Sequence, residues 1–241
     1  MHIHSCLSPC ADLAMSPRAI VARSVERGLD IIAVCDHNSA ENTAAVMKAA
    51  CGTSVCVLAG LEVCSSEEVH VLAVFDTGEQ ACELQQIVYA HLPGTNRPDL
   101  FGDQVVANEH DEVESFNERL LIGAVTIGLA KIVREIHRIG GLCIASHVNR
   151  QRYSLFSQLG FVPPDVQFDA LEISGHDIAQ STTCRMPATG TAPLVRFSDA
   201  HTLDAVGRAW TGFVMEKAEV EEIRMALTGR SGRKHKVLFA L

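Results

Sequence analysis

Short apolar runs alternate along the chain with segments in which apolar residues recur at helical spacing. Runs rich in Val, Ile, Leu and Ala are typical of buried strands, and spacings of three and four residues are typical of helices. The predicted strands cover residues 1–5, 29–35, 54–59, 69–75, 142–146, 170–174, 193–197 and 210–214, and the predicted helices cover 17–27, 40–50, 79–91, 127–139 and 219–227. This order predicts parallel βα units, and seven or eight of them predict an irregular α/β barrel.

Capping signals support two of these helices. Ser16 and Pro17 fit the start of the first helix, and Thr126 fits the start of the helix over 127–139. Residues 92–117 form a long polar connection with weak periodicity, which is often functional. Since no repeat or composition break marks a boundary, we expect residues 1–241 to form one domain that includes the strand and helix of 210–241.

Histidines and carboxylates gather at the ends of the predicted strands. The residues that share this position are His2, His4, His37, Glu62, His147, Asp199 and His201, whereas His70 opens the strand predicted over 69–75. Strand ends of one polarity open on the same face of a parallel barrel, so these side chains should converge. In addition, His2 and His4 are two residues apart and point to the same side of a strand, where both can bind one ion.

Mixed imidazole and carboxylate ligands suit Zn, Mn or Fe better than Mg or Ca. Two such ions can bridge a hydroxide and hold a phosphoryl group in line. They would also make the pocket locally positive, although the chain as a whole carries a net charge of −9. The sequence therefore predicts a metal centre suited to a phosphate substrate.

Six short motifs resemble, in order, those of the PHP (polymerase and histidinol phosphatase) family. They are His2-Ile3-His4-Ser5, Cys35-Asp36-His37-Asn38, Gly60-Leu61-Glu62, Val69-His70-Val71-Leu72, Ser146-His147-Val148-Asn149 and Ser198-Asp199-Ala200-His201. They span about residues 1–215. The resemblance implies a distorted (β/α)7 TIM-like barrel with two or three divalent ions.

By the same resemblance, His2, His4, Glu62 and Asp199 would hold one ion. Glu62 would bridge to a second ion on His70 and His147, and His37 and His201 would hold a third. A group from the loop after the first strand would complete the third site. Asp12 is the candidate, with capping of the loop as its alternative role, and the thiols of Cys6 and Cys10 are the other candidates.

The proton for the leaving group could come from Asp36, His201 or a metal-bound water, and Asp36 could instead orient His37. Arg150 follows His147, and its planar guanidinium suits a phosphate. Weaker candidates are Arg18 and Arg152 for substrate, His176 for metal or substrate, and Glu172 as a partner behind the ligands.

Composition narrows the remaining choices. Nine cysteines without a CxxC pair, and no secretory leader or membrane-length apolar run, indicate a reducing cytoplasm. The acidic balance argues against extended nucleic acid as a partner. We therefore expect hydrolysis of a phosphomonoester or phosphodiester of a small molecule or nucleotide. The alternatives are a nuclease acting on nucleic-acid ends, a non-catalytic metal-binding module, and, as a chemical neighbour, an amidohydrolase. Oligomeric state stays open.

Overall fold

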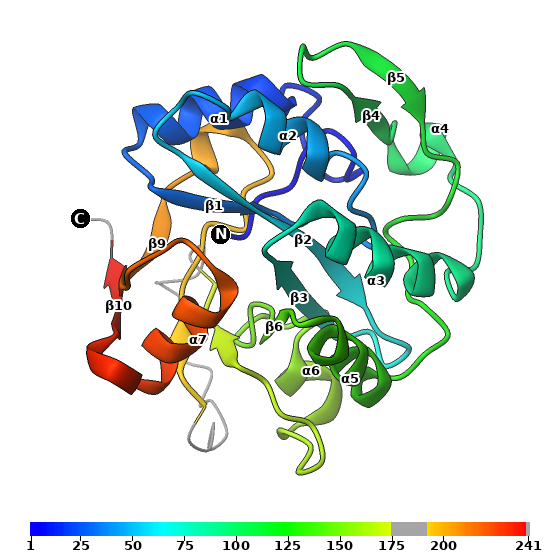
Figure 1. Ribbon diagram of the computed structural model, residues 1–241. Helices are drawn as coiled ribbons and strands as arrows, with labels where there is room; N and C mark the ends of the chain where they lie inside the picture. The colour runs from blue at the N-terminus through cyan, green and yellow to red at the C-terminus, as the bar shows by residue number, and fades with distance from the viewer. Residues whose placement is uncertain (175–191, 240–241) are drawn as a thin grey trace.

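A curled six-stranded sheet lies at the centre of the computed structural model, which describes residues 1–174 and 192–239 (Figure 1). The strands are, in sheet order, β1 (Ile31–Val34), β2 (Cys56–Cys64), β3 (His70–Phe75), β6 (Leu142–Ala145), β7 (Ala170–Glu172) and β8 (Leu194–Val195). Strands β1 and β2 are parallel, as are β6, β7 and β8 in succession. The α/β barrel class expected from the sequence is confirmed.

The first residues of the chain connect the two edges of this sheet. Ile3 forms parallel bridges to Val34 at the end of β1 and to Ala200, which lies beyond β8. The Cys35 N–H donates to the Ile3 carbonyl at 2.8 Å, and the His4 N–H donates to the Ala200 carbonyl at 2.9 Å. These contacts close the curled sheet into a barrel, and residues 2–4 form part of its wall.

Strand β3 differs from the expected pattern because it runs antiparallel to both of its neighbours. It pairs with β2 as a hairpin in which Cys64 faces His70, and it pairs with β6 on its other side. The short connection between β2 and β3 explains this direction, since a parallel crossover needs a dozen or more residues. His70, the first residue of β3, consequently lies at the same end of the barrel as the last residues of the parallel strands.

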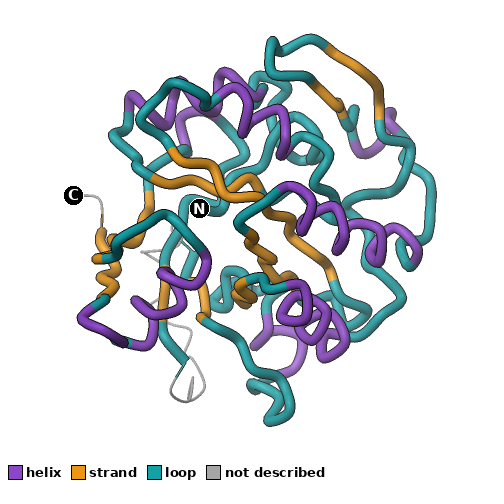
Figure 2. Tube along the Cα trace, in the orientation of Figure 1, coloured by secondary structure: helices purple, strands orange, loops and turns teal. Residues whose placement is uncertain are grey.

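Alternation along the strands separates two apolar layers. On β2, Leu58 points into the barrel interior with Leu72 and Ile144, whereas Leu61 and Val63 point outward. The helices cover the outside of the sheet (Figure 2). They are α1 (Pro17–Glu26), α2 (Thr43–Ala49), α3 (Gly78–Ala90), α5 (Leu129–Ile139) and α6 (Leu155–Leu159). Helix α7 (Val220–Thr228) packs on the interior cluster through Val220, Ile223 and Leu227, among other side chains.

Several boundaries differ from the sequence prediction. Strand β2 continues through Glu62 to Cys64, so Glu62 lies within the strand. Helix α5 begins at Leu129 after Gly128, not at Ile127 after Thr126, because the Glu67 carboxylate accepts a hydrogen bond from the Leu129 N–H at 2.9 Å. Beyond the last predicted helix, the chain forms a short 3-10 helix, Arg230–Gly232, and then a strand that the sequence did not predict.

Two small additions complete the chain. The polar connection of 92–117 contains α4 (Pro98–Phe101), β4 (Val105–Ala107) and β5 (Val113–Phe116), and the last two pair antiparallel. Near the C-terminus, β9 (Ala209–Val214) and β10 (Lys234–Phe239) form a second two-stranded sheet, and another 3-10 turn covers Leu203–Ala205. In the described part of the chain, every helix is too short or too polar to cross a bilayer.

Candidate metal centre

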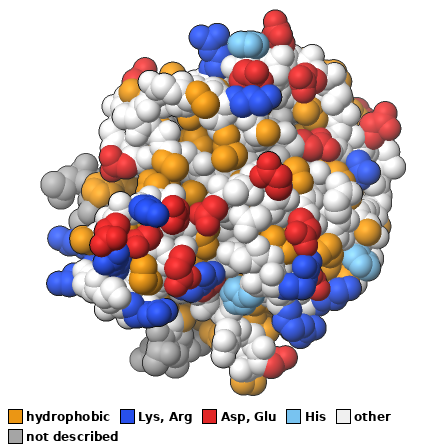
Figure 3. Space-filling model, in the orientation of Figure 1, with side chains coloured by type: hydrophobic (Ala, Val, Ile, Leu, Met, Phe, Trp, Pro, Cys, Tyr) orange, Lys and Arg blue, Asp and Glu red, His pale blue; other side chains and the backbone are white. Residues whose placement is uncertain are grey.

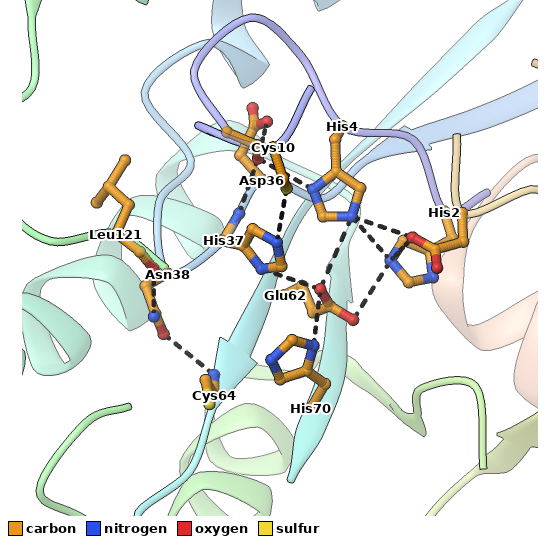
Figure 4. Close-up of polar contacts among 12 residues, drawn as sticks. His2, His4, Cys10, Asp36, His37, Asn38, Glu62, Cys64, His70 and Leu121 are labelled. Atoms are coloured by element: carbon orange, nitrogen blue, oxygen red, sulfur yellow. Dashed lines mark hydrogen bonds and ion pairs between the residues drawn. The ribbon is translucent and has the colours of Figure 1, made fainter. Parts of the chain in front are cut away.

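An open pocket of about 410 Å³ lies at the barrel end where the parallel strands terminate. It is lined by Cys10, His37, Glu62, His70, Ile122, His147, Arg150, Gln151, Arg152, Tyr153, Asp199 and His201. His2 and His4 lie beneath it and are fully buried. Figure 4 shows His2, His4, His37 and His70 around the Glu62 carboxylate. The structure therefore brings together the predicted ligands that come from six distant segments of the sequence.

Glu62 is the common neighbour of five imidazoles. Its Oε2 lies 3.1 Å from His37 Nδ1 and 3.2 Å from His70 Nδ1, and its Oε1 lies 3.4 Å from both His2 Nε2 and His147 Nε2. His4 Nε2 is 3.7 Å from Oε2. Burial raises the pKa of Glu62, but the charges of His70 and His2 outweigh burial and hold that pKa well below its usual range. Glu62 is therefore an ionised carboxylate with both oxygens available to bridge two ions.

Hydrogen bonds orient the two buried histidines of the first segment. His2 Nδ1 lies 2.9 Å from Glu172 and His4 Nδ1 lies 3.0 Å from Ser8 Oγ, so the Nε2 atom of each ring is directed toward the cluster. These two Nε2 atoms are 3.1 Å apart, and both are 3.3 Å from Asp199 Oδ1. Two bonds of about 2.0–2.1 Å to one ion would separate ligand nitrogens by about 3–3.5 Å. The arrangement fits a divalent cation between the three groups.

Two ligand positions have left-handed backbone conformations that are uncommon for residues other than glycine. His147 has φ 28° and Asp199 has φ 46°, and both follow the end of a strand. Such conformations cost on the order of 1–3 kcal/mol and persist where the surrounding structure holds them. Here they turn the two side chains back toward the pocket, which is consistent with a functional demand on their direction.

Three groups of side chains among the described residues bring ligand atoms within 4.8 Å of one another. They are His2 with His4 and Asp199, His37 with Glu62 and His70, and His4 with His37 and His201. Within residues 1–174 and 192–239, buried atoms that form no hydrogen bond include Glu62 Oε1, His70 Nδ1 and His147 Nδ1. Buried polar atoms normally have partners, so Glu62 Oε1 and His70 Nδ1, which face the cluster, fit bound divalent ions. The donor set of imidazoles and carboxylates suits Zn, Mn or Fe.

Asp36 does not have the place that the sequence suggested. It is 1% exposed, does not line the pocket, and accepts hydrogen bonds from Ser5 N, Ser5 Oγ and Ser8 Oγ. Ser8 in turn accepts from His4 Nδ1, so Asp36 orients His4 through Ser8 and not His37 directly. A role for Asp36 as proton donor to the leaving group is not consistent with this burial.

Asp12 also lies outside the cluster. Its side chain is exposed, and its Oδ1 accepts a hydrogen bond from the Ala14 N–H at 2.8 Å, so it caps its own loop. The Asp12 N–H is bonded to the His201 carbonyl at 2.8 Å, which fixes the backbone with the carboxylate turned away. Cys10 takes the inward position, with Sγ 3.2 Å from His37 Nε2, whereas buried Cys6 contacts the Val105 carbonyl.

Burial raises the pKa of the Cys10 thiol. The charge of His37 and hydrogen bonding to the neighbouring histidines outweigh burial and lower this pKa to about 6. Asn38, next to His37, donates to the carbonyls of Leu121 and Gly123 and so holds Ile122 at the pocket. Figure 4 shows Asn38 beside Leu121.

Only some of the residues that the sequence suggested for substrate binding lie at the pocket. Arg150 and Arg152 line the pocket, and Arg150 Nη1 forms an ion pair with Asp199 Oδ2 at 2.7 Å. Arg18 is exposed on α1 and does not line it. His176 lies outside the described residues. The sequence thus placed Arg150 correctly at the pocket but gave no sign of Gln151 and Tyr153, which lie beside it.

Glu172 supports two of the proposed metal ligands from behind. It is fully buried, its carboxylate lies 2.9 Å from His2 Nδ1, and it accepts a hydrogen bond from the His147 N–H at 3.2 Å. Partners behind metal-binding histidines typically contribute about 10–100-fold in metal affinity. We expect Glu172→Ala to weaken metal binding by about this factor, measured by competition with a chromophoric chelator. Glu172→Gln, which keeps an acceptor, should lose less. Unchanged affinity in Glu172→Ala would contradict this role.

The family model of the PHP domain matches residues 1–187, and the PHP-associated model matches residues 198–231. The chain therefore belongs to the PHP-domain family, as its six motifs predicted. No curated protein matches the chain.

Solved structures of the same fold include the lesion-specific endonuclease EndoQ from Pyrococcus furiosus. It is 21% identical, with a TM-score of 0.72, over 98% of this chain and 56% of that one. This chain thus spans little more than half of that protein. An Endonuclease Q complex with a 27-mer duplex carrying an abasic lesion has a TM-score of 0.70 at 21% identity, over 97% and 57% of the two chains. A protein from Bifidobacterium adolescentis, provisionally described as a metal-dependent phosphoesterase, has a TM-score of 0.56 at 17% identity, over 83% and 86%.

The Endonuclease Q complex bears on one prediction. The acidic composition argued against extended nucleic acid as a partner, yet a protein containing this fold is described in complex with a DNA duplex. Overall charge is therefore an insufficient reason to exclude nucleic acid for this fold, and the prediction is not supported.

Proposed function

We propose that the pocket hydrolyses a phosphomonoester or phosphodiester whose phosphoryl group binds between the Glu62 cluster and Arg150. The observation that carries this proposal is the convergence of five imidazoles on one buried, ionised carboxylate at the base of an open pocket. When bound, divalent ions would act as Lewis acids toward phosphoryl oxygens and lower the pKa of water. A pocket of about 410 Å³ is within the range for a small-molecule or nucleotide ligand.

Arg150 supplies the substrate contact in this proposal. Its side chain is 31% exposed, and its guanidinium is anchored to Asp199 through Nη1. Asp199 also lies beside His2 and His4, so Arg150 sits directly against the proposed ion site. A planar guanidinium held at this position can donate its remaining N–H groups to a phosphoryl oxygen and orient it toward the ions.

His201 faces the pocket with a single available nitrogen. Its Nδ1 donates to the Asp199 carbonyl at 2.9 Å, so Nε2 is the nitrogen that can contact a ligand. That atom can hold an ion or transfer a proton to a leaving group, but it cannot do both at once. Since Asp36 is buried away from the pocket, a metal-bound water and His201 are the remaining sources of that proton.

A nuclease activity is the second candidate, and Tyr153 favours it. This side chain is 40% exposed and stacks on His70, with ring centroids 4.8 Å apart at 19°. Its open face and the neighbouring Arg152 offer a surface on which a base can stack next to the ions. On the face shown in Figure 3, Lys and Arg side chains are interspersed with Asp and Glu, so a long basic track does not mark that face.

The test is a comparison of substrates on protein loaded separately with Mn, Zn or Fe. Nitrophenyl phosphomonoester, bis-nitrophenyl phosphodiester, single-stranded oligonucleotides and duplexes with and without an abasic site would be compared under identical conditions. We expect metal-dependent release of product from at least one ester, and no release by chelator-treated protein. Cleavage confined to oligonucleotides would favour the nuclease candidate. Full metal occupancy without hydrolysis of any of them would contradict the proposal and favour a non-catalytic module.

A further inference from the structure

The loop after the first chain segment brings a thiol against the histidines at the pocket mouth. Cys10 Sγ is 3.2 Å from His37 Nε2, and Cys10 lines the pocket together with His201. The loop is fixed from both sides, because the Ala11 N–H donates to the Ser8 carbonyl and the Asp12 N–H donates to the His201 carbonyl. The inward position of Cys10 is therefore built into the backbone of the loop.

The three histidines next to this thiol form a ligand group without a carboxylate. His4, His37 and His201 bring nitrogen atoms within 4.8 Å of one another. Two of the rings are oriented by their other nitrogen: His4 donates to Ser8, and His201 donates to the Asp199 carbonyl. The His201 ring therefore presents a lone pair on Nε2 to this volume, whereas the Nε2 of His4 faces His2 and Asp199 and belongs to their ion site.

The distance between sulfur and nitrogen agrees with coordination of one ion. Bonds of about 2.3 Å to sulfur and about 2.0–2.1 Å to nitrogen, at a tetrahedral angle, separate the two ligand atoms by about 3.5 Å. The observed 3.2 Å requires only a small side-chain rotation to reach this value. Two imidazoles and one thiolate fill three positions of the four-coordinate shell that Zn prefers.

We propose that Cys10 is the third protein ligand, as a thiolate, of a divalent ion held by His37 and His201. The proposal rests on the proposed function in one respect, namely that this cluster binds metal. On binding, the thiol loses its proton to solvent and the sulfur forms the bond to the ion. A soft sulfur ligand makes this site more selective for Zn, Fe or Co than the Glu62 site, and less suited to Mn or Mg. The pocket would thus contain two chemically different kinds of ion site.

Cobalt spectroscopy tests this assignment without depending on activity. A thiolate bound to Co²⁺ gives a charge-transfer band in the near ultraviolet, whereas nitrogen and oxygen ligands do not. The protein would be loaded with Co²⁺ under a non-thiol reductant, and bound cobalt per chain would be measured alongside the spectrum. The variants are Cys10→Ser, Cys10→His and the control Cys51→Ser, whose cysteine is exposed near the end of α2.

We expect the band in the wild type and in Cys51→Ser, and its loss in Cys10→Ser together with weakening of one cobalt site by about 100-fold or more. Cys10→His should recover cobalt binding without the band, which shows that the variant is folded. A band that persists in Cys10→Ser would overturn the proposal, as would a wild type that binds cobalt without the band. A wild type that binds no cobalt, zinc or manganese would overturn the proposed function as well.

Discussion

Replacing Glu62 with glutamine is expected to lower phosphoester turnover by at least about a thousandfold, since each tenfold corresponds to about 1.4 kcal/mol and metal catalysis supplies several kcal/mol. The reason is that Glu62 is the one carboxylate in contact with five imidazoles, so its charge is shared between the ion sites. Glutamine keeps the size of the side chain and loses the charge. Turnover and metal content would both be measured on the purified variant.

A matched control separates this effect from a general loss of glutamate. Glu26 is 63% exposed on α1 and pairs with Arg23, far from the pocket, so Glu26→Gln should retain wild-type turnover and metal content. Circular dichroism would verify that both variants are folded. Wild-type turnover and full metal content in Glu62→Gln would show that Glu62 does not bridge the ions.

Removal of metal is expected to lower the melting temperature by about 8–16 °C. A ligand present at about a thousandfold above its Kd stabilises the folded state by about 4 kcal/mol, and each kcal/mol shifts Tm by about 2–4 °C for a chain of this size. Without ions, the cluster contains buried imidazoles whose Nε2 atoms face one another at 3.1 Å, which adds to the cost. Thermal unfolding with and without a chelator, with metal content checked, measures the shift.

The same measurement on Glu62→Gln shows whether the stabilisation comes from this cluster. The variant should show a much smaller chelator-induced shift than the wild type, because it has already lost part of its metal binding. An equal shift in both proteins would place the stabilising ion elsewhere in the chain. A wild type that loses its metal without any change in Tm would contradict the expected stabilisation.

The proposed pocket combines a buried anionic centre with a positively charged rim. Glu62 and Asp199 lie at its base, with Arg150 and Arg152 at the mouth. Bound cations at the base would reverse the local charge there and make the whole pocket attractive to a phosphate. This is why a chain with a net charge of −9 can act on an anionic substrate.

Most of the ligands could be predicted from the sequence because their positions follow from local rules. His2 and His4 alternate on one face of an extended segment, and His37 and His147 follow apolar runs that can only be strands. The order of the motifs then identified the family. The same local rules predicted α1 and α3 within a residue or two of their observed bounds.

The tertiary structure decided what depends on contacts between distant segments. The antiparallel direction of β3 brings His70 to the ligand end of the barrel, although this residue begins its strand. Whether Asp12 or Cys10 turns inward is set by the bond from Asp12 N–H to the His201 carbonyl, about 190 residues away in sequence. The partners Glu172 for His2, and Asp36 through Ser8 for His4, are likewise products of packing. Spacing along the chain determines the face on which a side chain lies, and only the packed barrel determines which other side chains it meets.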